Sequence, residues 1–196
     1  MIKSLTRLNI RINGGFYIYL ALLLLVIPLP WLTAWILAAV IHELGHVAVI
    51  MLSGHEILKM DIGWQGARIM TDPLGRSEWY CALAGPVAGI FLLLLIHIFP
   101  RLSICALIQS AYNLFPIYPL DGGRVLKGLL LFVLDEAKVD FIVRVVAALF
   151  LLMSILMAWN LADTAINLFF VLAAGMLMAK TVIINIPCKH RKKWVQ

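Results

Sequence analysis

Long apolar runs separated by short polar segments make up most of this chain of 196 residues. Several runs approach or exceed the ~20 residues that cross ~30 Å of hydrocarbon as an α-helix. The pattern predicts an all-α fold class: a polytopic membrane protein with about six transmembrane helices in a single domain, 1–196. The expected spans are approximately 12–28, 31–52, 79–99, 102–120, 139–159 and 162–186.

Two of the polar segments carry a pattern of their own. In 53–78, short alternating pieces surround Gly63 and Gly66, and an Asp-Pro turn signal follows. This pattern predicts a small β-hairpin at the cytoplasmic face of the membrane. The second segment, 121–140, joins a short apolar piece to charged residues, which is typical of a surface helix or a re-entrant turn.

Composition and charge agree with a membrane protein. Hydrophobic residues make up 63% of the chain and charged residues 13%, whereas soluble domains average roughly 45–50% and about 25%. The net charge of +6 does not indicate nucleic-acid binding, because the basic residues flank the apolar runs. With the N-terminus inside, fifteen of the sixteen Lys and Arg residues are cytoplasmic, and only Arg101 is outside. This distribution predicts a multi-pass protein of the cell membrane with both termini cytoplasmic.

The second apolar run contains AAVIHELGHVAVI, residues 38–50, in which three costly polar residues interrupt a membrane helix. His42 and His46 are four residues apart, so a helix places both imidazoles on one face, where they can ligate one metal ion. Glu43 completes an HExxH motif, in which two histidines bind zinc and the glutamate is the general base. A carboxylate at the centre of a membrane helix costs at least ~2.5–3.5 kcal/mol, which zinc and water would offset. The alternative is that the histidines, with Glu43 as partner, bond neighbouring helices.

Zinc in a catalytic site needs a third protein ligand and an open position for water. Asp163 is expected near the outer end of its span, on the wrong side, whereas Asp121 follows NLFPIYPL at an inner end. His42 lies about ten residues from the cytoplasmic end of its helix, or ~15 Å deep at ~1.5 Å per residue. Asp121 must reach that depth, and Pro116 and Pro119 predict a broken helix there, which is tolerated where it lines a cavity. The alternative is an ordinary helix end at the interface.

HELGH in one span, together with NLFPIYPLDGGR at the end of another, resembles the site-2 protease family of intramembrane zinc metalloproteases. The likeness is greatest to the sporulation branch, whose members cleave an inhibitory pro-sequence from a sigma factor, and it covers roughly 36–127. The resemblance implies that His42, His46 and Asp121 hold Zn²⁺ while Glu43 activates water. It also implies that Asn113 hydrogen-bonds substrate or the developing oxyanion; the alternative for this asparagine is a hydrogen bond between helices.

The sequence departs from that branch in two places. Sporulation-branch enzymes typically carry a C-terminal cystathionine-synthase-type nucleotide-sensing domain, to which the basic segment CKHRKKWVQ is no counterpart, so this domain is expected to be lacking. AGPVAG, residues 84–89, matches a Gly-Pro motif of the third span, but many relatives have Asn in place of Gly89. Close helix packing by small residues explains that motif equally well.

The predicted function is hydrolysis of peptide bonds in membrane-spanning or membrane-attached proteins near the cytoplasmic side, with activation of a transcription factor by regulated intramembrane proteolysis. The segment 53–78 is expected to offer a strand edge to an extended substrate, and the resemblance implies an inhibitory membrane partner. Expected partners are thus a membrane-protein substrate and the lipid bilayer, not nucleic acid. Two alternatives stay open: a zinc transporter, which needs polar residues toward both faces, and a non-catalytic scaffold with a relict site.

Overall fold

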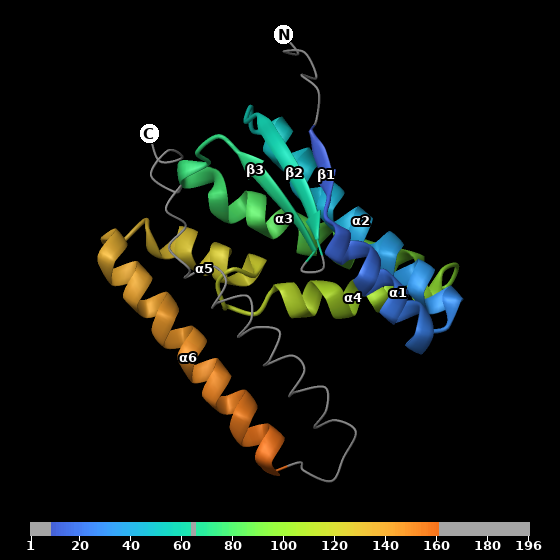
Figure 1. Cartoon of the computed structure of the whole chain (residues 1–196). Coiled ribbons are helices and arrows are strands. Elements are labelled where there is room, and N and C mark those ends of the chain that lie inside the picture. The colour runs from blue at the N-terminus through green and yellow to red at the C-terminus, as the bar shows by residue number, and fades with distance from the viewer. Residues whose placement is uncertain (1–8, 64–65, 161–196) are drawn as a thin grey trace.

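The computed structural model describes residues 9–63 and 66–160, so the expected sixth span, 162–186, lies outside the described residues (Figure 1). Most of the described chain is helical, and three short strands form one sheet. In chain order, the elements are β1 (Ile10–Ile12), α1 (Gly14–Val26), α2 (Leu29–Leu52), β2 (Ile57–Gly63), β3 (Gly66–Thr71), η1 (Gly75–Ser77), α3 (Glu78–Phe91), η2 (Leu92–Leu95), α4 (Pro100–Asn113), α5 (Asp121–Leu130) and α6 (Glu136–Asn160).

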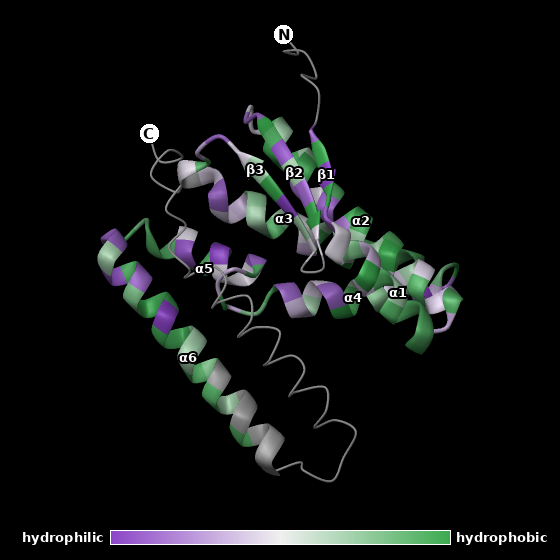
Figure 2. Ribbon diagram, in the orientation of Figure 1, coloured by the Kyte–Doolittle hydropathy of each residue, from purple (hydrophilic) through white to green (hydrophobic). Residues whose placement is uncertain are grey.

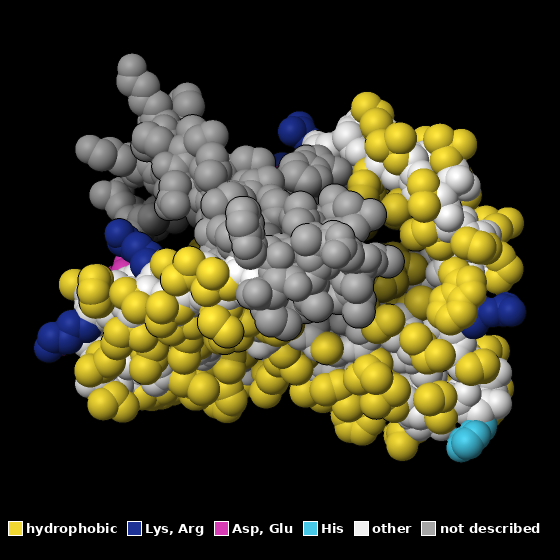
Figure 3. Space-filling model, turned by 90° about the horizontal axis from the view of Figure 1, so that it is seen from below, with side chains coloured by type: hydrophobic (Ala, Val, Ile, Leu, Met, Phe, Trp, Pro, Cys, Tyr) yellow, Lys and Arg dark blue, Asp and Glu magenta, His cyan; other side chains and the backbone are white. Residues whose placement is uncertain are grey.

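Among the described residues, two helical stretches are long and apolar enough to cross a membrane by length and composition. These are α2 and the continuous helical stretch Glu78–Leu95, while the apolar helix α1 is shorter. The surface supports a lipid environment, because large hydrophobic side chains are exposed over many helices, with Leu25 82% and Leu52 86% exposed. Hydrophobic side chains also dominate the face seen in Figure 3, and basic side chains lie toward its margins.

The hairpin expected in 53–78 is present: β2 and β3 are antiparallel, with Met60 opposite Ile69 and Asp61 opposite Arg68. The third strand was not predicted. β1 pairs in parallel with β2, so the all-α expectation with only a hairpin is corrected to a mainly helical fold with a three-stranded sheet. β1 is only three residues long and lies beside a long apolar run, so it shows no strand periodicity in the sequence. It forms because its backbone groups pair with those of the otherwise free edge of β2.

Small residues let the central helices approach closely. α2 packs against both α3 and α4 (Figure 1). A Cβ atom at Gly45 would lie 2.7 Å from Ala88 Cβ, so α2 and α3 can meet only because this position is glycine. Hydrogen bonds hold α4 in place: Gln109 Nε2 donates to the Trp35 carbonyl of α2 at 2.8 Å, and Ser103 Oγ donates to the Leu92 carbonyl at 2.7 Å. In an apolar surrounding such packing and bonding replaces the hydrophobic effect between helices.

The break after α4 sets the position of Asp121. α4 ends at Asn113, and the loop 114–120, which contains Pro116 and a cis peptide bond before Pro119, leads into α5. Asp121 is therefore the first residue of α5, at the start of the segment 121–140 in which a surface helix or a re-entrant turn was expected. The prolines stop the helix as predicted, and α5 begins at once because Gly122 and Gly123 are packed against the loop backbone with no space for a Cβ.

Hydropathy separates the two ends of the molecule. In Figure 2, α5 and the adjoining turn of α6 are rich in hydrophilic residues, whereas α1 and the later turns of α6 are hydrophobic. α6 contacts the rest of the protein through α5 and the loop 114–120, where Ala147 and Phe150 pack on Ile117 and Leu120. The polar elements thus gather around the start of α5, which is the region that carries Asp121.

Candidate metal centre

Three predicted ligands, far apart in the sequence, meet in the structure. His42 and His46 lie on the buried face of α2, one turn apart, and the start of α5 brings Asp121 beside them. Asp121 Oδ2 is 3.0 Å from His42 Nε2 and 3.2 Å from His46 Nε2, and the two Nε2 atoms are 3.2 Å apart. All three side chains are nearly enclosed, with 6%, 7% and 12% of their surfaces exposed.

The hydrogen bond of His46 to a backbone carbonyl leaves its Nε2 atom available to bind a metal ion. His46 Nδ1 lies 2.8 Å from the Cys81 carbonyl oxygen, which can only accept, so Nδ1 carries the proton and donates. Nε2 of the neutral imidazole is then an acceptor, and it faces the acceptor oxygen of Asp121. Acceptors that converge in a buried place repel one another unless a proton or a metal ion lies between them. The Cys81 carbonyl also orients the ring, as outer-shell partners of metal-bound histidines do.

The spacing fits a metal of the size of zinc. With bonds of about 2.0–2.1 Å at tetrahedral angles, neighbouring ligand atoms lie roughly 3.3–3.4 Å apart, close to the observed separations of 3.0–3.2 Å. Space for the ion is kept open by Gly85 on α3. A Cβ atom there would lie 2.8 Å from His42 Nε2 and 2.6 Å from His46 Cε1, so any side chain would enter the cradle.

The two other predicted site residues also lie at this cluster. Asn113 is the last residue of α4, and its Nδ2 is 3.3 Å from His42 Nε2. Glu43 follows His42 on α2, is half-buried, and interacts electrostatically with both histidines and with Asp121. Three convergent ligands, with a carboxylate and an amide beside them, form an arrangement that can hold a metal and exchange a proton with a nearby water.

Three contributors to the site were missed by sequence reasoning. The Cys81 carbonyl is a backbone group, so no residue type identifies it. Gly85 belongs to the AGPVAG motif, which was noticed, but the clearance it provides becomes visible only when α3 is placed against α2. Arg124 lies one turn after Asp121, with Nη1 3.9 Å from Asp121 Oδ1, and the DGGR spacing could have pointed to it.

His55, in the loop after α2, is partly buried and hydrogen-bonded. Its Nδ1 is 3.3 Å from Asp72 and its Nε2 is 2.8 Å from Ser77 Oγ. Ser77 donates its own hydroxyl proton to the Leu74 carbonyl, so His55 Nε2 is the donor to Ser77. The cluster ties the loop after α2 to the end of β3 and to the start of α3, and it lies outside the metal centre.

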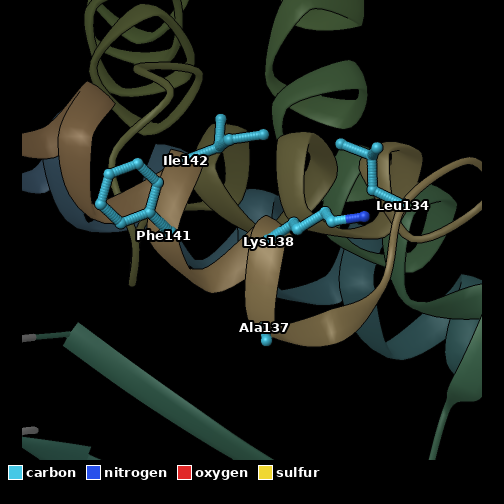
Figure 4. Close-up of a pocket in the computed structure, with 5 residues that line it drawn as sticks. All are labelled: Leu134, Ala137, Lys138, Phe141 and Ile142. Carbon is cyan, nitrogen blue, oxygen red and sulfur yellow. The ribbon is translucent and has the colours of Figure 1, made fainter.

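A surface hollow between the α5–α6 turn and the first turns of α6 is separate from these residues. Figure 4 shows its lining, which is Leu134, Ala137, Lys138, Phe141 and Ile142. This lining is hydrocarbon apart from Lys138, whose ammonium pairs with Asp135 at 3.2 Å. The hollow therefore offers no metal ligand and no catalytic group.

Comparison with known proteins gives matches of one kind. No family model matches the chain. A zinc metalloprotease of Methanocaldococcus jannaschii is 28% identical over 93% of this chain and 57% of its own length. The stage IV sporulation protein FB of Bacillus subtilis is 29% identical over 61% of this chain and 46% of its own. A putative zinc metalloprotease of Synechocystis is 31% identical over 51% of this chain and 32% of its own.

The chain thus spans about half the length, or less, of these curated relatives. Among solved structures, the site-2 protease of Methanocaldococcus jannaschii shares the fold, with a TM-score of 0.65, 22% identity and 89% of each chain covered. The resemblance predicted from HELGH and NLFPIYPLDGGR agrees with these findings: the chain is similar in sequence to proteins named zinc metalloproteases and shares its fold with a solved site-2 protease.

Proposed function

We propose that this chain is an intramembrane zinc metalloprotease that uses the centre formed by His42, His46 and Asp121. The observation that carries the proposal is the convergence of one potential ligand atom from each of three side chains, with space kept for an ion by Gly85. Two relatives are named zinc metalloproteases, and their names support zinc as the ion. Zinc held there supplies a Lewis acid that makes water more acidic and polarises a peptide carbonyl.

Glu43 then acts as the proton carrier of the reaction. It takes a proton from the attacking water and returns it to the nitrogen of the leaving amine. Asn113, whose amide lies beside His42, is suited to donate a hydrogen bond to the carbonyl oxygen as negative charge develops. Support for these roles is geometric, because Glu43 and Asn113 flank the ligand cluster from α2 and α4.

The substrate in this proposal is a membrane-spanning or membrane-attached protein, cut near its cytoplasmic end. A helix hides its peptide bonds, so the substrate must be extended at the site. The sheet favours this, since within the described residues β3 pairs only with β2 and its other edge is free to take a strand by β-addition. We also propose release of a transcription factor as the outcome, under the control of an inhibitory membrane partner, which is what the resemblance to the sporulation branch implies.

The topology belongs to the same proposal: a multi-pass protein with both termini cytoplasmic and the site in the cytoplasmic half of the bilayer. Support comes from the distribution of Lys and Arg and from exposed apolar helices. Reporter fusions at Gly75, in the loop before α3, and near Arg101, before α4, test it. A cytoplasmic signal at Gly75 and an external signal near Arg101 are expected, and the reverse would exclude this orientation.

Catalysis is tested with Glu43→Gln in purified protein. The variant should keep wild-type zinc content and lose cleavage of a co-expressed membrane substrate, because only the proton carrier is removed. Glu56→Gln, an exposed carboxamide exchange in the loop after α2, is the matched control and should cleave normally. Cleavage by Glu43→Gln at the wild-type rate would exclude the mechanism. The same variant, expressed in its own cell, should let uncut substrates accumulate for identification.

The ligand set and the two alternatives are tested in parallel. Asp121→Ala should lower zinc occupancy, whereas Asp135→Ala, at a carboxylate that is 82% exposed, should not. A zinc transporter would instead carry zinc into proteoliposomes. A scaffold with a relict site would bind zinc without cleaving any substrate. Neither zinc uptake nor zinc-loaded inactivity is expected.

A further inference from the structure

A short chain of charged side chains extends from the metal centre to α3. Arg124, on α5, has Nη1 3.9 Å from Asp121 Oδ1 and Nε 3.5 Å from Glu78 Oε1. The three side chains are largely shielded, with 30% of Arg124, 31% of Glu78 and 12% of Asp121 exposed. A guanidinium group is well suited to bridge two carboxylates, because its planar fork of donors can contact both at once.

The two oxygens of Asp121 face different partners. Oδ2 points to the two histidine Nε2 atoms, while Oδ1 lies on the side of Arg124. A carboxylate that is free to rotate about its last bond could present either oxygen, or both, to a metal. A cation on the Oδ1 side opposes this rotation and leaves Oδ2 as the single ligand atom.

From this division of the carboxylate we infer that Arg124 is a positioning residue for Asp121: it holds Oδ1, aims Oδ2 at the metal, and is itself anchored by Glu78. The inference rests on the proposed zinc site and adds a residue to it. The same first turn of α3 also supplies the Cys81 carbonyl that orients His46. One turn of helix thus supports ligands from α2 and from α5, which are far apart in the chain.

Charge balance gives Arg124 a second reason to be present. Asp121 and Glu43 place two carboxylates at the centre and Glu78 a third beside Arg124, and the Arg124 charge acts on Glu43 as well as on Asp121. Removal of the guanidinium would leave like charges closer to their full mutual repulsion in a partly buried region. Lys127, one turn further along α5, does not share this role, because its ammonium pairs with Asp140 on α6 at 2.8 Å.

The test measures zinc binding to the purified full chain in detergent, by competition with a chromophoric chelator. Arg124→Gln should weaken zinc binding ~10–100-fold, the usual effect of losing an outer-shell partner. Arg124→Lys should have a zinc affinity between those of wild type and Arg124→Gln, about threefold or more weaker than wild type, because a point charge cannot hold both carboxylates. The matched control Lys127→Gln removes the same charge from the same helix and should bind zinc within about twofold of wild type.

Cobalt substitution gives a second readout that does not depend on activity. The visible absorption of Co²⁺ reports ligand geometry, and it should change in Arg124→Gln and not in Lys127→Gln. Should Arg124→Gln fail to fold, Arg124→Lys decides by the same two measurements. Zinc affinity and cobalt spectra equal to those of wild type in the Arg124 variants would overturn the inference.

Asp121→Ala, measured beside these variants, separates the two proposals. If Asp121→Ala loses zinc and Arg124→Gln keeps wild-type affinity, the inference fails and the zinc site stands. If the wild-type chain binds no zinc at a defined stoichiometry, both fail.

Discussion

Gly85, which has no side chain, is the position in the proposed centre that should tolerate substitution least. In Gly85→Ala the new methyl carbon would lie 2.6 Å from His46 Cε1 and 2.8 Å from His42 Nε2. Comfortable carbon contacts lie at ~3.5–4.0 Å, so the two imidazoles or α3 would have to move by about 1 Å. Metal–ligand distances tolerate only about ±0.2 Å, and the carbonyl of Cys81 holds His46 in place. At least one ligand bond should therefore be lost.

The expected magnitude is a loss of zinc affinity of at least ~100-fold, which is about 2.8 kcal/mol at ~1.4 kcal/mol per tenfold change. The assay is chelator competition on the purified chain in detergent, with zinc content measured after dialysis. Gly89→Ala is the matched control: it adds the same methyl group on the same helix, one turn away, where it would meet Ser110 of α4. This control should lower thermal stability and leave zinc stoichiometry unchanged.

Two results would refute this reasoning. Wild-type zinc affinity in Gly85→Ala would mean that the ion does not sit between the histidines and α3. An equal loss of zinc in Gly89→Ala would mean that zinc binding responds to α3 packing in general, and not to the space beside the histidines.

Three further predictions concern residues around the centre. Asn113→Ala should lower kcat ~10²–10³-fold, as loss of an oxyanion donor does, with zinc content unchanged; zinc loss would instead make Asn113 a support for His42. His55→Ala should lower the melting temperature in detergent by removing bonds to Asp72 and Ser77 worth ~1 kcal/mol each, and an unchanged melting temperature would contradict this. Lys127→Gln should destabilise by under ~1 kcal/mol in chemical unfolding, because the Lys127–Asp140 pair is partly exposed; a larger loss would contradict a surface pair.

Local patterns explain why so much could be predicted. A helix has a period of 3.6 residues, so the spacing of His42 and His46 alone predicts that their rings share a face. Length and apolarity locate helices, and Pro116 removes a backbone donor and so ends α4 wherever that helix is packed. Asp121 could be selected as a ligand candidate because few acidic residues lie at the required depth.

Tertiary structure decided everything that depends on contacts between distant segments. Asp121 meets the histidines across 79 and 75 residues of chain, and its place as the first residue of α5 follows from the packing of the glycines after it. The parallel pairing of β1 depends on an edge that β2 offers only once the hairpin is folded. The Cys81 carbonyl, the clearance at Gly85 and the contacts of Arg124 likewise have no local signature. They arise because α3 lies against both α2 and α5, and sequence periodicity describes one helix at a time.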